Sequence, residues 1–333
     1  MINRIIELRN NVKRENRPDD YVSLWFEDEP YRGQRQRSMV LVLRTKGCFW
    51  FKHSGCTMCG YYNDTNDGNV NEKNLINQVE KSRQKYKGEK IVKIYNSGSF
   101  FDQNEIPLEA QEKIIESFPE AERIIVETRP EFINESLMKK INKYKEKLMI
   151  AIGLESSDND VLINSINKGF TIDAYERAAK LLLQNGFVIK TYILLKPPFL
   201  TEKKAINDAV KSIEFASIYS ELISLNPVNI QNNTLVEFLW RKGYYRSPWL
   251  WSVVDVLKKT SHLGKVGSFP TAPGTQRGAH NCGKCDEDVI KAIENFSFTQ
   301  DVEYLNSIKE CKCKINWEKI LDFEELTFST LGD

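Results

Sequence analysis

TKGCFWFKHSGCTMCGYY, residues 45–62, contains three of the seven cysteines of this chain and follows the apolar run Met39–Leu43, which predicts a strand. The three are spaced Cys48-x7-Cys56-x2-Cys59. A structural zinc site uses four protein ligands, whereas a four-iron cluster bound by only three thiolates keeps one iron open. The odd number of thiols therefore favours an iron–sulfur cluster, and aromatic neighbours on both sides favour a dry pocket.

Two other interpretations of this loop remain open. Cys56 and Cys59 fit half of a zinc site completed by Cys48 and His53, and they also fit a redox pair of the C-x-x-C kind. Spacing alone does not decide among the three.

Size and composition indicate a soluble globular enzyme or binding protein. A chain of 333 residues accommodates one large α/β domain and a smaller part. Its apolar runs are too short to span a membrane, and the N-terminus lacks the apolar segment of a secretion signal. We therefore expect a cytoplasmic protein without membrane contact, whose cysteines bind metal rather than form disulfides.

The charge is unevenly distributed although the formal net charge is only +1. Residues 30–63 carry six Lys/Arg and no acid, and residues 240–285 carry eight Lys/Arg against one Asp, so the remainder has a net charge of 1 − 6 − 7 = −12. Two basic segments on a nearly neutral protein indicate an anionic partner.

Strands and helices alternate along the chain after the cysteine loop. The expected strands are 39–43, 90–96, 123–130, 147–156, 187–195 and 221–228. Such apolar strands in strict alternation with helices predict a parallel sheet, either a barrel or doubly wound. No G-x-G-x-x-G follows the first strand, which counts against a dinucleotide-binding domain. Polar residues instead follow successive strands, as at the active-site rim of a barrel.

These features resemble the radical S-adenosylmethionine superfamily, in its branch related to the elongator complex catalytic subunit. The loop is similar to that branch's cluster-binding loop, with Met58 where the superfamily commonly has an aromatic residue. The runs IVETRPEFI, MIAIGLESSDNDVL and GFVIKTYILLKPP resemble its later strands. The resemblance implies a partial (β/α)6 TIM-type barrel at 39–230, after a helical and basic extension (1–38) and before a Cys-rich substrate- or RNA-contacting module (231–333).

Within that branch the chain most resembles the radical enzymes of archaeosine synthesis. The resemblance implies cleavage of the lysine side chain of a lysine-modified deazaguanine in the tRNA D-loop, through a 5′-deoxyadenosyl radical. It also implies three partners: tRNA, the subunit that transfers lysine, and a one-electron donor such as ferredoxin or flavodoxin. Two alternatives remain, namely another radical tRNA-modifying enzyme (wobble-uridine carboxymethyl type) and a non-catalytic, zinc-stabilised RNA-binding protein.

The resemblance also implies the site residues. Cys48, Cys56 and Cys59 would bind three irons of a [4Fe-4S] cluster, and S-adenosylmethionine would chelate the fourth. The expected cofactor contacts are Ser97, Gly98, Ser99, Glu155 and Met58. The candidate catalytic residues are Glu127, Arg129 and Lys190. A simple ion pair between Glu127 and Arg129 is the competing interpretation of those two.

The C-terminal hundred residues contain the other four cysteines, in two close pairs. Cys282/Cys285 and Cys311/Cys313 form a closed set of four, which favours structural zinc over a second iron–sulfur cluster; His280 is an alternative ligand. Between residues 240 and 251, aromatic residues alternate with Lys and Arg. This pattern is typical of RNA-binding proteins, in which nucleic-acid bases stack on aromatic rings and phosphates meet basic side chains. For Trp249 and Trp251 we expect helix packing instead.

Overall fold

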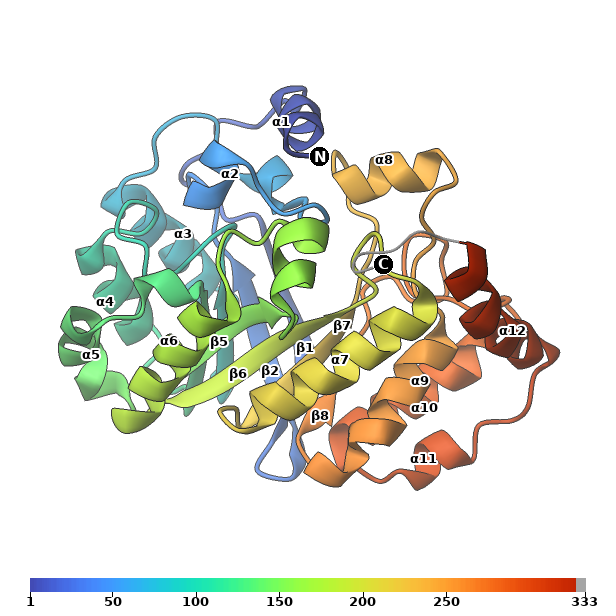
Figure 1. Cartoon of the computed structure of the whole chain (residues 1–333). Helices are drawn as coiled ribbons and strands as arrows, with labels where there is room; N and C mark the ends of the chain where they lie inside the picture. The colour runs from blue at the N-terminus through green and yellow to red at the C-terminus, as the bar shows by residue number, and fades with distance from the viewer. Residues whose placement is uncertain (328–333) are drawn as a thin grey trace.

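The computed structural model describes residues 1–327 and contains one curled, eight-stranded sheet whose strands follow in chain order (Figure 1). The first two strands form an antiparallel hairpin, and every later neighbour pairs in parallel. The strands are β1 (Ser23–Tyr31), β2 (Gln34–Val42), β3 (Ile91–Tyr95), β4 (Arg123–Thr128), β5 (Leu148–Glu155), β6 (Val188–Leu195), β7 (Leu222–Pro227) and β8 (Val266–Gly267).

Helices cover the outer face of this sheet (Figure 1). The α-helices of residues 1–327 are α1 (Ile2–Asn10), α2 (Phe49–His53), α3 (Glu72–Arg83), α4 (Leu108–Glu116), α5 (Glu135–Ile141), α6 (Ile172–Gln184), α7 (Glu202–Ser217), α8 (Leu235–Arg241), α9 (Leu250–Thr260), α10 (Asp286–Thr299), α11 (Glu303–Asn306) and α12 (Lys312–Thr327). Of these, α1, α2 and α8 lie beyond the ends of the strands and not over the outer face (Figure 1). The short ones are η1 (Tyr61–Asp64), η2 (Pro130–Phe132), η3 (Asn142–Tyr144), η4 (Val161–Ile166) and η5 (Ser261–Leu263). Within residues 1–327, none has the length and apolar content of a membrane span.

The predicted barrel class is confirmed, because the six expected strands are β2 to β7 of the half-barrel. β3 and β5 are buried along nearly their whole length, because helices cover their outer face and their inner face lies inside the half-barrel. Two further strands, β1 and β8, extend the sheet at its edges. We did not expect β1, whose sequence SLWFEDEPY is rich in charge, nor β8, which has only two residues.

The C-terminal helices pack onto the barrel beside α7. Contacts join α9 to α7, α10 to α9 and α12 to α7. Trp249 and Trp251 are buried here, with 8% and 4% of their surface exposed, which confirms that they belong to the core. Tyr244 is 74% exposed, whereas the Tyr245 hydroxyl donates to the Lys196 carbonyl at 2.7 Å inside the protein.

Candidate functional site

A cavity of about 780 Å³ lies at the carboxyl ends of the parallel strands. This volume is within the range of roughly 300–1,000 Å³ that is usual for small-molecule sites. Ten of the predicted residues line it: Cys48, Cys56, Met58, Cys59, Ser97, Gly98, Glu127, Arg129, Glu155 and Lys190. They come together because the ends of neighbouring parallel strands share one rim. Ser99 does not line the cavity; it is buried behind it and braces its wall.

The cysteine loop is held in shape by hydrogen bonds to other elements. The Cys48 amide donates to the Ser97 carbonyl at 3.2 Å, which joins the loop to the turn after β3. The Thr57 hydroxyl donates to the Ser165 carbonyl at 2.9 Å, and the Asn167 side-chain amide donates to the Gly55 carbonyl at 2.7 Å. The last two bonds fix the loop against η4.

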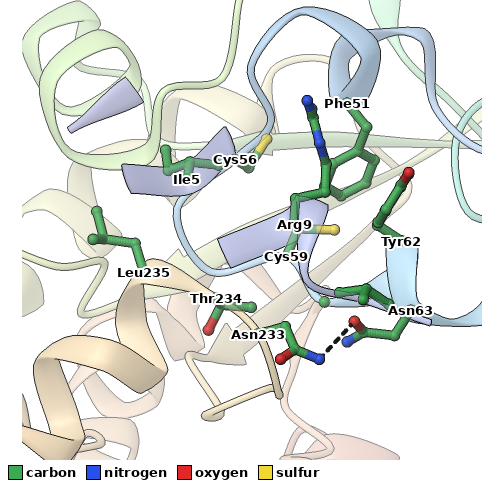
Figure 2. A pocket seen from close by; sticks show the side chains of 12 residues that line it. Ile5, Arg9, Phe51, Cys56, Cys59, Tyr62, Asn63, Asn233, Thr234 and Leu235 are labelled. Carbon is green, nitrogen blue, oxygen red and sulfur yellow. Dashed lines mark hydrogen bonds between the residues drawn. The ribbon is translucent and has the colours of Figure 1, made fainter. Parts of the chain in front are cut away.

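The N-terminal helix covers the back of the same loop (Figure 2). Ile5 of α1 is 6% exposed, and the Arg9 guanidinium donates to the Ser54 carbonyl at 3.3 Å. A small second pocket between α1, the loop and the start of α8 has both Cys56 and Cys59 in its wall. The loop therefore faces the large cavity on one side and is shielded by α1 on the other.

The turn Ser97-Gly98-Ser99 is braced by Glu105, a residue we did not predict. The buried Glu105 carboxylate accepts from the Thr45 hydroxyl at 2.5 Å, from the Asn96 side chain at 2.8 Å and from the Ser99 amide at 2.8 Å. Burial raises the pKa of Glu105 to about 7, although these three donors oppose the shift. Glu105 thus joins Thr45, at the start of the cysteine loop, to the turn at Ser97-Gly98-Ser99.

Glycine is required at position 98 because of a close approach to the cysteine loop. A Cβ atom on Gly98 would lie 2.7 Å from the Cα atom of Cys48, too close for any side chain. The absence of a side chain leaves backbone exposed to the cavity next to the thiol.

Charged pairs occupy the interior of the half-barrel. The Lys190 ammonium donates to the Glu29 carboxylate at 2.6 Å, and Lys93 donates to the same carboxylate. Lys168 pairs with Glu155 at 2.8 Å. Of these five residues the sequence indicated only Glu155 and Lys190 as site residues, because the partners lie on segments far apart in the chain.

Two other charged residues of the cavity differ in their environment. Burial raises the pKa of Glu127 to about 7, and the Tyr192 hydroxyl, as a hydrogen-bond donor, partly offsets this. Arg129 does not pair with Glu127, so the ion pair between them is not formed. Arg129 pairs instead with Glu131 at 2.7 Å and donates to the Lys168 carbonyl at 2.8 Å.

The three thiols of the cysteine loop line one cavity and could hold a metal cluster. Burial raises the pKa of Cys48 to about 11, and it also raises the pKa values of Cys56 and Cys59, so free thiols here stay protonated. A coordinating metal removes that proton. The positive charges of Arg129 and Lys168 act on Cys56 and oppose the effect of its burial. A set of metal-bound thiolates is anionic, and these cations complement it.

The four C-terminal cysteines form a compact group that suits a single metal ion. The Sγ atoms of Cys282, Cys285, Cys311 and Cys313 lie within 4.8 Å of one another. Adjacent sulfurs are 3.5, 3.7 and 4.0 Å apart. Tetrahedral thiolate ligands at about 2.3 Å from zinc are about 3.8 Å apart, whereas a disulfide is about 2 Å long. His280 is not in this group; its Nδ1 lies 2.9 Å from the Gly278 carbonyl.

Two donors support the sulfur atoms of this group. The Trp251 indole donates to the Cys313 sulfur at 3.3 Å, and the Asn281 side chain donates to the Cys285 sulfur at 3.5 Å. Such outer hydrogen bonds orient metal ligands. The group could therefore hold a metal ion, and it is closed to substrate because all four ligands come from the protein.

The sequence was compared with protein families, with characterised proteins and with solved structures. Residues 42–209 match the model of the radical SAM superfamily. Archaeosine synthase subunit beta of Methanosarcina acetivorans is 36% identical over 98% of this chain and 97% of its own. The protein of that name from Thermococcus kodakarensis is 35% identical over 90% of this chain and 97% of its own. Among solved structures, a radical SAM methyltransferase from Sphaerobacter thermophilus covers 74% of this chain and 69% of that one, at 12% identity and a TM-score of 0.48.

Proposed function

This chain belongs to the radical SAM superfamily, and from that premise we propose that it is the radical enzyme of archaeosine synthesis. In this proposal it cleaves the lysine side chain of a lysine-modified deazaguanine in the tRNA D-loop and leaves an amidine on the base. The relatives named archaeosine synthase subunit beta, similar over nearly the whole chain, support the choice of this reaction.

The observation that carries the proposal is the convergence of ten predicted residues around one cavity of about 780 Å³. The cavity brings three thiols, the turn at Ser97-Gly98 and two charged pairs into one enclosed space. Superfamily membership implies a [4Fe-4S] cluster, which would pass one electron from a donor to S-adenosylmethionine and so supply radical chemistry. Cys48, Cys56 and Cys59 are the residues that would hold it.

The other lining residues bind, orient and exclude water in this proposal. Ser97 and Gly98 offer backbone groups to the methionine part of S-adenosylmethionine, and Met58 contacts its adenine. The Glu155 carboxylate is held by the Lys168 ammonium at 2.8 Å. It accepts hydrogen bonds from the amine or the ribose hydroxyls of S-adenosylmethionine. Glu127, Arg129 and Lys190 also line the cavity and are the candidate catalytic residues. The pairs that hold Arg129 and Lys190 limit their motion.

The C-terminal module contributes stability and RNA contact in this proposal. Zinc bound by Cys282, Cys285, Cys311 and Cys313 would fix the chain around α10 and α12 against the barrel. The partners are tRNA, the subunit that adds lysine, and a one-electron donor such as ferredoxin or flavodoxin. A reaction of this kind on a polymer requires a partner surface for each of them.

The test uses protein reconstituted anaerobically with iron and sulfide, then incubated with lysine-modified tRNA, reductant and S-adenosylmethionine. We expect 5′-deoxyadenosine together with archaeosine in the digested tRNA. A colourless protein that binds only zinc and makes no 5′-deoxyadenosine would support a non-catalytic RNA-binding role instead. Formation of 5′-deoxyadenosine with a modified wobble uridine, and unchanged deazaguanine, would support the other radical reaction.

A further inference from the structure

Helix α1 covers the cysteine loop on the side away from the large cavity (Figure 2). Ile5 and Arg9 of α1 line the same small pocket as Cys56 and Cys59, so α1 lies directly against the part of the loop that carries these thiols. The opposite face of α1 is exposed at Asn3, Glu7 and Asn10. An α-helix with its side chains is about 10–12 Å across. A molecule docked on the exposed face of α1 is therefore about one helix diameter from the loop.

Two aromatic rings connect α1 with the large cavity. The Arg9 guanidinium lies 5.7 Å from the centre of the Tyr62 ring, and Tyr62 lies beside Phe51 with 5.3 Å between ring centroids. Phe51 lines both the small pocket and the large cavity. Electron transfer through a protein slows steeply with distance, so this short path of contacts suits the entry of electrons from the side of α1.

The segments that form this side of the protein carry an excess of positive charge. Residues 1–18 contain five Lys/Arg against two Glu, and residues 45–63 contain two Lys and no acid. Both Glu are neutralised by neighbouring guanidinium groups. Glu7 pairs with Arg4 at 2.7 Å, and Glu15 pairs with Arg44 at 3.3 Å. The charge that remains unpaired is therefore positive.

Two exposed lysines carry this unpaired charge next to the small pocket. Lys13 and Lys52 are exposed and form no ion pair within residues 1–327. Lys13 directly follows Val12, and Lys52 directly follows Phe51. Val12 and Phe51 both line the small pocket, so the two lysines flank it. Unpaired surface charge of one sign attracts a partner of the opposite sign and speeds its association.

The position of this surface distinguishes between two kinds of anionic partner. An RNA that is to be modified must place a base in the large cavity, which lies on the other side of the cysteine loop. An electron carrier needs a short distance to the thiols and no access to that cavity. A positive surface behind the loop therefore suits an acidic electron carrier better than RNA.

We propose that an acidic one-electron carrier protein docks on the surface formed by the exposed face of α1, Lys13 and Lys52. This inference rests on the proposed function, which requires a one-electron donor but assigns it no surface. The docked carrier is oxidised by one electron, which passes to the group held by Cys48, Cys56 and Cys59. Donor and substrate then occupy opposite sides of the cysteine loop, so an electron is delivered while the cavity is filled.

The first arm measures binding without turnover. Fluorescence anisotropy follows dye-labelled ferredoxin, as the acidic carrier, and in parallel labelled transfer RNA, each with the reconstituted full chain. The test variant is the double charge reversal Lys13→Glu/Lys52→Glu. We expect it to weaken ferredoxin binding by about 5- to 30-fold, because two attractive charges become repulsive.

A second double charge reversal is the matched control. Lys139→Glu/Lys319→Glu changes two exposed lysines, on α5 and α12, that also form no ion pair within the described residues. It alters the net charge by the same amount and should bind ferredoxin like the wild type. Transfer RNA should bind equally to both double variants.

The second arm measures how fast the reconstituted protein is reduced, by stopped-flow absorbance. With limiting reduced ferredoxin, we expect Lys13→Glu/Lys52→Glu to be reduced more slowly than the control variant by about the factor lost in binding. With dithionite, a small reductant that needs no docking surface, both variants should match the wild type. Their melting temperatures should also match it, because all four lysines are exposed.

Four results would overturn the inference: no ferredoxin binding by the wild type, wild-type affinity in Lys13→Glu/Lys52→Glu, an equal loss in the control variant, or a loss of RNA binding in place of ferredoxin binding. The proposed function fails in a different way. If ferredoxin supports formation of 5′-deoxyadenosine but lysine-modified tRNA stays unchanged, the proposed function is refuted, and the binding and reduction measurements still decide where the carrier docks.

Discussion

Replacement of Glu29 by glutamine is expected to destabilise the protein by about 3–4 kcal/mol at pH 7. Glu29 is 4% exposed and its carboxylate is shared by the ammonium groups of Lys190, at 2.6 Å, and Lys93. Glutamine fills the same space, so the change removes charge and not volume. It leaves two cations in the interior of the half-barrel without their counter-ion.

Two estimates of the magnitude agree. Removing one partner of a buried ion pair costs about 3–5 kcal/mol, because the remaining charge stays buried. Burial by itself would raise the pKa of Glu29, but the ammonium groups of Lys190 and Lys93 outweigh it and lower the pKa from 4.5 to about 2. A shift of this size corresponds to about 3 kcal/mol. Because the folded pKa is the lower one, this stability is complete above pH 4.5 and is lost as the pH falls toward 2.

Urea unfolding of the wild type and Glu29→Gln between pH 3 and pH 8 measures this effect. A loss of this size lowers the urea midpoint by about 1 M or more at neutral pH. The difference should shrink as the pH falls below 4.5, because the Glu29 carboxylate of the wild type then takes up a proton when the chain unfolds. Glu122→Gln is the control, since Glu122 also pairs with two cations, Arg32 and Lys90, but at the surface, and its midpoint should hardly move. Equal midpoints for Glu29→Gln and the wild type at pH 7 would refute the reasoning.

Three further predictions concern the metal sites, a buried carboxyl group and RNA binding. Cys56→Ala should abolish cluster absorbance and 5′-deoxyadenosine formation, whereas Cys311→Ala should remove bound zinc and lower the melting temperature; cleavage retained in the first variant would contradict the site. Burial raises the pKa of Asp208 to about 7, and its Oδ2 has no hydrogen-bond partner among the described residues, so wild-type stability should fall as the pH rises from 4 to 7. Asp208→Asn should then unfold at a higher urea concentration than the wild type at pH 8, but not at pH 4. Affinity for tRNA should fall steeply with salt, because binding releases counterions, and a flat dependence in a filter-binding assay would contradict a phosphate contact.

The sequence was sufficient to predict the strands whose residues are mostly apolar along their whole length. β3 and β5 read as continuous hydrophobic runs, and the side chains that follow parallel strands had to meet at one rim. For that reason Glu127, Arg129 and Glu155 could be assigned to a common site from strand order alone. Their chemical roles stay predictions.

Residues whose importance depends on a distant partner could not be found in this way. Glu29 lies 161 positions before its partner Lys190, and it looks like an ordinary surface charge in the sequence. Glu105 lies in a loop and acts through backbone and side-chain donors that only the fold brings to it. One signal was present in β1, where Trp25, Glu27 and Glu29 alternate with the period of a strand and place two carboxylates on the inner face.

The contact of α1 with the cysteine loop has a consequence for the order of events during synthesis. α1 leaves the ribosome before the loop and α8, yet it lies against Ser54 of the loop and against α8, which is made more than two hundred residues later. The Arg4 guanidinium lies 4.2 Å from the centre of the Phe238 ring, so this contact forms only when α8 has emerged. Until then the small pocket behind Cys56 and Cys59 lacks the wall that Thr234 and Leu235 form, so this side of the loop is more open on the nascent chain than in the folded protein.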